Sequence, residues 1–322
     1  PAAGGPYSIV LKGENTIELS NVLIGEVWVC SGQSNMEMND GWGGIPDIKA
    51  ALPGCANNRI RFFAVPQTTS LYPQDNCGGE WIHCDSNTLK AFSAVAYFFG
   101  RKINTTLNVP VGLISSNWGG TPAETWTEPS AIDNTPALKA AAAKLQPYDW
   151  WPHRAGAAYN AMIAPLTNFT IAGAIWYQGE GNTIAPDTYA QLLTTMIGTW
   201  RKAWGKELPF YYVQIAPFTY ENKFVSSIIR EQQTKAMAYP NVGMVVVTDG
   251  VDNVKDIHPK GKQLVGERLA NWALSQTYQQ QGITYKSPVY SNMEVQKNKA
   301  IIAFDNVPNR LMCKDKTVTE LF

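Results

Sequence analysis

The sequence has no excess of charge of either sign and no long apolar run. Its 322 residues include 26 Lys and Arg against 26 Asp and Glu, a formal net charge of zero. A balanced surface has no field that would concentrate nucleic acid or an anionic membrane. No apolar stretch approaches the roughly 18 residues of a membrane-spanning helix. These absences predict a protein with no nucleic-acid partner and no membrane span.

Histidine and cysteine are also scarce, with three and five residues. There is no CxxC motif, and no group of carboxylates and histidines has the spacing of metal ligands. We therefore expect no metal site and no cofactor, which disfavours a metal-dependent phosphoesterase. The odd number of cysteines leaves at least one thiol unpaired within the chain, and Cys30 is expected to be a buried free thiol. Cys77 and Cys84 are expected to close a small disulfide loop, with Cys55 and Cys313 as further candidates.

One short stretch carries the first sign of chemistry. The apolar run 27–30 predicts a buried strand, and the small polar cluster that follows, 31–35, predicts a tight turn leaving it. Gly32 allows a sharp bend, which would present Ser34 at the end of the strand as a nucleophile. The alternative is a Ser-Asn pair that only caps a helix.

The middle of the chain alternates strand and helix patterns. Predicted strands are 27–30, 60–65 (as an edge strand), 111–114, 174–177, 210–215 and 242–247, and predicted helices are 89–107, 136–145, 187–204, 225–239 and 259–281. This alternation predicts an α/β fold in which helices cover both faces of a parallel sheet.

The two ends depart from this pattern. Residues 7–19 and 289–304 each predict a short β-hairpin, with turns at 13–15 and 297–298. We expect three parts: a β segment at 1–22, an α/β body at 23–285 and a partial β segment at 286–322. The terminal segments would belong to flanking β domains of a longer protein.

Four polar clusters each follow a predicted strand: 32–35, 116–121, 178–182 and 256–259. The carboxyl ends of parallel strands share one edge of the sheet, so the clusters should gather there. Together they supply a hydroxyl, an imidazole near a carboxylate, amide groups and glycine-rich turns. These are the components of acyl transfer by a serine nucleophile.

The motifs at these clusters resemble those of the sialate O-acetylesterase family of SGNH hydrolases. They are Ser-Gly-Gln-Ser-Asn-Met, Ser-Asn-Trp-Gly-Gly-Thr-Pro-Ala-Glu-Thr-Trp, Trp-Tyr-Gln-Gly-Glu-Gly-Asn and Asp-Ile-His-Pro. The resemblance runs in order from about Gly4 to Ala303. It implies an SGNH-hydrolase-like three-layer fold.

The resemblance also implies roles for individual residues. Ser34 would be the nucleophile and His258 the base, and the N–H groups of Ser34 and Gly119 with the side chain of Gln178 would form the oxyanion hole. Four more residues are expected to contact substrate or to support the residues that do: Gln33, Asn35, Trp118 and Glu180. Glu180 is either a general acid or, as we favour, a partner that steadies the amides of Gln33 and Gln178.

The acid that orients the histidine is less well defined. The wider group places an aspartate three residues before the histidine, whereas Asp256 here is two before His258. Asp256 is the first candidate, and Asp252 or Asp249 are alternatives. A Ser-His dyad whose imidazole is oriented by a carbonyl or amide is a further possibility.

The resemblance predicts an esterase that removes acetyl groups from sugar hydroxyls, with O-acetylated sialic acid as substrate. The alternatives are deacetylation of xylan or another polysaccharide, and a non-catalytic carbohydrate-binding protein. Two glycosylation sequons, at Asn104 and Asn168, favour a secreted or lysosomal location.

Overall fold

The computed structural model describes residues 2–307 and 311, and its centre is a seven-stranded sheet. The strand order is β5-β4-β6-β3-β7-β8-β9. The strands are β3 (Glu26–Gly32), β4 (Asn57–Ala64), β5 (Trp81–Cys84), β6 (Val111–Asn117), β7 (Gly173–Tyr177), β8 (Phe210–Val213) and β9 (Val242–Val245). All neighbours are parallel except β5, which runs antiparallel to β4.

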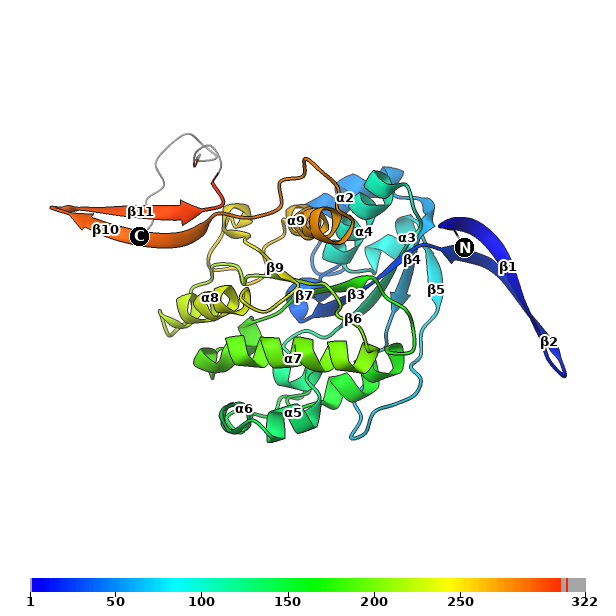
Figure 1. Ribbon diagram of the computed structural model, residues 1–322, viewed down its shortest axis with the longest axis horizontal. Coiled ribbons are helices and arrows are strands. Elements are labelled where there is room, and N and C mark those ends of the chain that lie inside the picture. Colours follow the sequence, from blue (N-terminus) through cyan, green and yellow to red (C-terminus); the bar gives the residue numbers. More distant parts are fainter. Residues whose placement is uncertain (1, 308–310, 312–322) are drawn as a thin grey trace.

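Helices cover both faces of this sheet (Figure 1). One layer contains α4 (Ala94–Leu107) and α9 (Lys262–Trp272), and the other contains α7 (Tyr189–Trp204) and α8 (Val225–Ala236). Shorter helices fill the margins: α1 (Ser34–Glu37), α2 (Pro46–Ala51), α3 (Ser86–Lys90), α5 (Pro129–Asp133) and α6 (Pro136–Ala142). The predicted three-layer α/β fold is confirmed.

Strand β3 lies at the middle of the sheet and contributes to both cores. Its side chains alternate, so Trp28 and Cys30 pack on the α4–α9 side, while Val29 packs on the α7–α8 side. All three are fully buried. A strand covered on both faces reads as a continuous apolar run, which is the pattern that predicted it.

Several boundaries differ from those predicted. The edge strand is β5, so β4 is an inner strand. The predicted helix 89–107 is two helices, α3 and α4, because Ser93 accepts a hydrogen bond from the Ala96 N–H and caps a new helix. The predicted helix 259–281 begins only at Lys262 and changes to a π-helical turn, Ala273–Thr277, after Trp272.

The predicted disulfide loop is wrong, since Cys77 and Cys84 are free thiols. Cys84 is instead buried in β5, where its Sγ donates to the Cys55 carbonyl at 3.2 Å. Cys30 is a buried free thiol, as predicted. Cys313 lies outside the described residues.

The two predicted hairpins form, and they project from opposite sides of the body (Figure 1). The first pairs β1 (Gly4–Lys12) with β2 (Thr16–Ile24), and the second pairs β10 (Val289–Gln296) with β11 (Lys299–Asp305). Both expose large apolar side chains, among them Leu11 and Val295. In the described part of the chain, no helix has both the length and the apolar character needed to cross a membrane.

Candidate active site

The end of β3 brings three of the four polar clusters together. Gly32, its last residue, is in register with Asn117 of β6 on one side and with Tyr177 of β7 on the other. The chain leaves the sheet here through a backbone with φ of +141°, and a Cβ at Gly32 would lie 2.2 Å from the Tyr177 carbonyl oxygen. Only glycine fits this approach. The next turn therefore opens helix α1 with Ser34.

Ser34 and His258 meet at this edge although they are far apart in sequence. Ser34 Oγ lies 2.9 Å from His258 Nε2. His258 lies in the loop before α9 and is partly buried, and Ser34 is 7% exposed. A hydroxyl within hydrogen-bond reach of an imidazole nitrogen is the geometry of a nucleophile and its base. The fourth predicted cluster thus joins the other three.

The environment of His258 favours its neutral form. Burial lowers the pKa of the ring below its ordinary value, and the nearby Lys262 ammonium lowers it further, whereas Asp256 raises it. A neutral imidazole can accept a proton, so the base is ready near neutral pH. The ring of Trp42 packs edge-on against His258, with centroids 5.5 Å apart, and was not foreseen from the sequence.

Asp256, the first candidate for the orienting acid, lies beside the histidine and contacts its backbone. Its Oδ1 accepts the backbone N–H of His258 at 2.9 Å, so the carboxylate holds the loop, and its charge acts on the ring. Asp249 pairs with a different residue, because both of its carboxylate oxygens accept hydrogen bonds from Arg268. Asp252 lies exposed in the same loop. The hydrogen bonds of the site describe a Ser-His pair with Asp256 supporting the backbone.

Gly119 adjoins the nucleophile, as predicted for an oxyanion donor. A Cβ at Gly119 would lie 3.5 Å from Ser34 Cβ. Its N–H, however, donates to Glu37 Oε2 at 2.5 Å, and Gln67 donates to Glu37 Oε1. Burial raises the pKa of Glu37, while these two hydrogen bonds oppose the shift. Glu37 lies one helical turn after Ser34, and no sequence pattern pointed to it.

Gln178 does not match the predicted role. Its side chain is fully buried. Nε2 donates to the Thr121 carbonyl at 3.2 Å and to Asn182 Oδ1 at 2.8 Å, and Oε1 accepts from the Tyr189 hydroxyl. Both amide hydrogens are used inside the protein, so Gln178 braces the loop after β7 instead of facing a substrate.

The remaining predicted residues also have defined positions. Gln33 Oε1 accepts the N–H groups of Gly179 and Gly181, which ties the nucleophile turn to the loop after β7. Asn35 is buried and donates to Glu180 Oε1 at 2.7 Å. Glu180 therefore supports an amide, although it is that of Asn35 and not those of Gln33 or Gln178.

Trp118 is partly exposed at the rim of the site. Its indole N–H donates to the Trp150 carbonyl at 2.9 Å, and the neighbouring Gly120 lies against the Trp151 ring. Three tryptophans from two segments thus line this side. Flat apolar rings beside polar groups suit the faces of a sugar.

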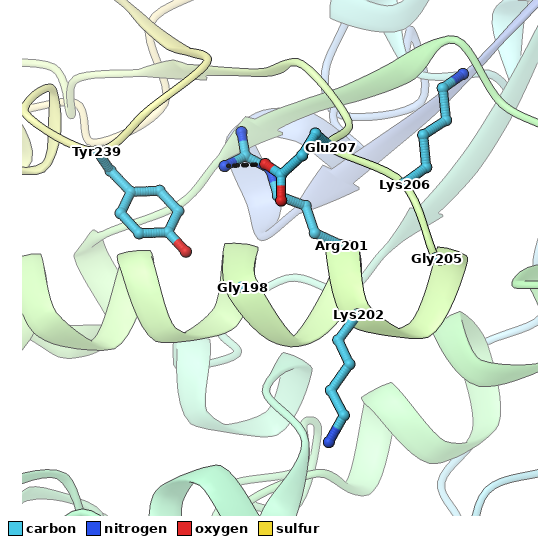
Figure 2. A pocket seen from close by; sticks show the side chains of 7 residues that line it. All are labelled: Gly198, Arg201, Lys202, Gly205, Lys206, Glu207 and Tyr239. Atoms are coloured by element: carbon cyan, nitrogen blue, oxygen red, sulfur yellow. Dashed lines mark ion pairs between the residues drawn. The ribbon is translucent and has the colours of Figure 1, made fainter.

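A separate hollow of about 350 Å³ lies away from this site, at the end of α7 (Figure 2). Its lining residues are Gly198, Arg201, Lys202, Gly205, Lys206, Glu207 and Tyr239. Arg201 donates to the carbonyls of Leu208 and Asn241 and pairs with Glu207, while Lys202 points away from the others. The charge of the buried Arg201 is thus paired with Glu207, and its donors hold the α7–β8 and α8–β9 connections together. Within the described ranges, no group of three or more His, Cys, Asp or Glu residues is arranged to hold a metal ion.

Comparisons with known proteins place the chain in a family. Residues 24–275 match the family model "Carbohydrate esterase, sialic acid-specific acetylesterase". The chain is 31% identical to the sialate O-acetylesterase of Pongo abelii and 30% identical to that of Homo sapiens, in each case over 93% of this chain and 63% of the relative. It therefore spans less than two thirds of the length of these curated relatives.

Among solved structures, a carbohydrate acetylesterase from Xanthomonas citri superposes with a TM-score of 0.82 at 33% identity, over 94% of this chain and 68% of that one. A protein from Arabidopsis thaliana shares the fold, with a TM-score of 0.51 at 16% identity, over 79% of this chain and 99% of that one. The chain belongs to the family of sialic acid-specific acetylesterases among the carbohydrate esterases.

Proposed function

We propose that this chain carries the catalytic body of an esterase that removes O-acetyl groups from sugars, with O-acetylated sialic acid as the substrate. The contact between Ser34 Oγ and His258 Nε2 is the observation that carries the proposal. The family match and the relatives named sialate O-acetylesterase support the substrate.

The reaction follows from the positions of these groups. Ser34 Oγ attacks the acetyl carbonyl carbon while His258 Nε2 takes the hydroxyl proton. His258 then gives this proton to the sugar oxygen as the C–O bond breaks, leaving an acetylated Ser34. A water molecule, deprotonated by His258, then attacks the acetyl carbonyl carbon. As the bond from this carbon to Ser34 Oγ breaks, His258 returns the proton to Oγ and acetate is released.

Backbone donors stabilise the oxyanion in this proposal. The Ser34 N–H, at the start of α1, and the Gly119 N–H are the two donors. Because Glu37 holds the Gly119 N–H in this structure, that donor becomes available when the Glu37 carboxylate turns away. A donor aimed at developing charge contributes about 10²–10³ to kcat.

The test is to measure aryl acetate hydrolysis by Ser34→Ala, His258→Ala and the double variant. Each single change should lower kcat by roughly 10⁶, and the double change should be no worse, because the two residues act as a unit. Ser31→Ala is a matched control, since Ser31 is a buried serine of β3, three residues before Ser34, whose hydroxyl has no hydrogen-bond partner among the described residues. Substantial turnover by Ser34→Ala would refute the mechanism.

Substrate choice needs a second measurement. Acetate release is compared between O-acetylated sialic acids and acetylated xylo-oligosaccharides with the native chain. Preference for the sialic acids supports the proposal, and preference for the xylo-oligosaccharides makes the chain a polysaccharide acetylesterase. No release from any ester would indicate a carbohydrate-binding protein.

The domain organisation and location are part of the same proposal. The terminal parts 1–22 and 286–322, in which the two hairpins lie, would be segments of flanking β domains around the 23–285 body. Their exposed apolar side chains support this assignment. We also propose a secreted or lysosomal location. The Asn168 sequon is exposed, whereas Asn104 is buried and its amide is hydrogen-bonded to Asn57 and Val109.

A further inference from the structure

A buried lysine behind the site takes no part in the reaction described above. Lys262 is the first residue of α9 and is fully buried. Its Nζ donates to Asn35 Oδ1 at 2.7 Å and lies 5.3 Å from the centre of the Tyr177 ring. An ammonium group is costly to bury and is retained where it has close partners. The question is what this cation does beside Ser34 and His258.

Asn35 connects the two reacting residues through the backbone. Its Nδ2 donates to the Ile257 carbonyl at 3.0 Å as well as to Glu180 Oε1 at 2.7 Å. Asn35 directly follows Ser34, and Ile257 directly precedes His258. One amide thus fixes the nucleophile turn against the histidine loop, within one residue of each reacting side chain.

The two charged neighbours decide which way this amide points. An ammonium group can only donate, and an ionised carboxylate can only accept. When both are charged, Lys262 therefore requires the Asn35 oxygen on its side, and Glu180 requires the nitrogen on the other. Burial raises the pKa of Glu180, whereas the hydrogen bond from Asn35 and the charge of Lys262 oppose this rise and favour the ionised form. With the amide reversed, the Asn35 oxygen would face the Ile257 carbonyl, and the link to the histidine loop would be lost.

We propose that Lys262 is a positioning residue of the esterase: it holds the Asn35 amide in the one orientation that joins Ser34 to the loop of His258. The inference rests on the proposed function, since it concerns how the Ser34–His258 pair is held. Neither Lys262 nor Glu180 touches the reacting atoms in this arrangement.

The charge of Lys262 also affects the pKa of the base, His258. The charged groups that act on His258 are Lys262, which lowers its pKa, and Asp256, which raises it. Burial lowers the pKa of Lys262 to about 7, although the charges of Glu180, Asp256 and Asp47 each raise it. Burial of the ring also lowers the pKa of His258 and remains without the lysine, but removing Lys262 takes away one of the two lowering effects, so the pKa of His258 rises. Because the base must be neutral, the acid limb of kcat/KM then moves to higher pH.

The experiment is Lys262→Met, assayed with p-nitrophenyl acetate from acid to neutral pH. We expect kcat to fall roughly 10²-fold, the cost of a misplaced reacting group, with KM nearly unchanged. The acid limb should move to higher pH. Lys260→Met is the matched control, because Lys260 is an exposed lysine two residues earlier and should leave both quantities unchanged.

A second variant separates positioning from folding. Lys262→Met leaves the Glu180 carboxylate buried without its cation, which lowers stability. The double variant Lys262→Met/Glu180→Gln removes both charges and should regain the melting temperature. It should not regain turnover, because the introduced glutamine side chain can pair with either end of the Asn35 amide. Lys262→Arg, which keeps charge and donors, should retain the acid limb of the native enzyme.

Three results would overturn the inference. They are a folded Lys262→Met with native kcat and acid limb, a double variant that regains turnover together with stability, and a folded Lys262→Arg with a shifted acid limb. Failure of the proposed function gives a different result, because Ser34→Ala would then retain activity whatever Lys262 does.

Discussion

At the scale of single residues, the role of Asp256 decides whether the site is a Ser-His dyad or a Ser-His-Asp triad. Its carboxylate accepts the His258 backbone N–H and raises the pKa of the ring. An asparagine side chain in its place would keep an oxygen for that hydrogen bond but lose the charge. For Asp256→Asn we therefore expect kcat to fall by no more than roughly 10-fold, and the acid limb of kcat/KM to move to lower pH because the pKa of His258 decreases. Steady-state rates across pH measure both effects.

The contrary outcome is equally clear. A triad acid that holds the imidazole tautomer costs about 10⁴ in kcat when it is changed to asparagine. A loss of that size in Asp256→Asn, without a fall in melting temperature, would mean that the carboxylate reaches the ring during turnover. Asp252→Asn is the control, since Asp252 lies exposed in the same loop.

The residues that could be predicted are those whose position follows from local chain geometry. Ser34 follows a buried strand and a sharp turn, and His258 belongs to a cluster at the same sheet edge. The role of Gln178 could not be predicted, because Thr121, Asn182 and Tyr189 occupy its amide from other parts of the chain. Nor could Glu37 be identified, because its contact with Gly119 depends on how α1 packs beside the loop after β6.

At the scale of elements, the junction of β3 with α1 depends on Gly32. A Cβ there would overlap the Tyr177 carbonyl oxygen. Gly32→Ala should lower the free energy of unfolding by about 2–3 kcal/mol through crowding and backbone strain. It should also lower kcat by roughly 10²-fold, since the displaced turn carries the nucleophile. Denaturant unfolding and aryl acetate hydrolysis measure the two losses.

Gly13→Ala serves as the control, because a Cβ at Gly13 meets no atom within 4 Å. If Gly32→Ala unfolds like the native chain and turns over at the native rate, the close approach of β3 to β7 is not required. Glycine would then be needed at position 32 only for the flexibility of the chain.

The type and order of the main elements were predictable, and their ends were less so. Apolar periodicity predicts α7 and β9 well, because α7 buries one face and β9 buries both. The break between α3 and α4 depends on a cap at Ser93, and the end of α9 on a change of helix type after Trp272. Apolar periodicity also does not show which strand lies at the edge of a sheet. Strand β5 was not predicted because only Cys84 of its four residues is buried.

At the scale of the whole molecule, the β10–β11 hairpin is separate from the site. Its strands pair with each other and are exposed along nearly all of their length. A chain of residues 1–288 keeps Ser287, whose hydroxyl accepts the Val246 N–H. We expect its melting temperature to stay within about 2 °C of the full chain, less than about 1 kcal/mol, and its aryl acetate turnover to be unchanged.

A chain of residues 1–276 is the comparison. It lacks Tyr278, whose hydroxyl accepts from Trp28 Nε1 at 3.0 Å and donates to Glu26 at 2.8 Å. Losing these contacts to β3 should destabilise the body. Unfolding of the 1–288 chain would instead show that the hairpin belongs to the core of the molecule.

The central place of β3 has a consequence for when activity can appear as the protein is made. The nucleophile strand comes early in the chain, but both of its partners, β6 and β7, come much later, and His258 and Lys262 later still. Pairings between distant segments form slowly because long loops must close first. A nascent chain that ends before β7 leaves one edge of β3 unpaired and has no base for Ser34. In the proposed esterase, hydrolysis can therefore begin only after the segment with His258 has been made, so that completion of the sheet is itself the step that starts the activity.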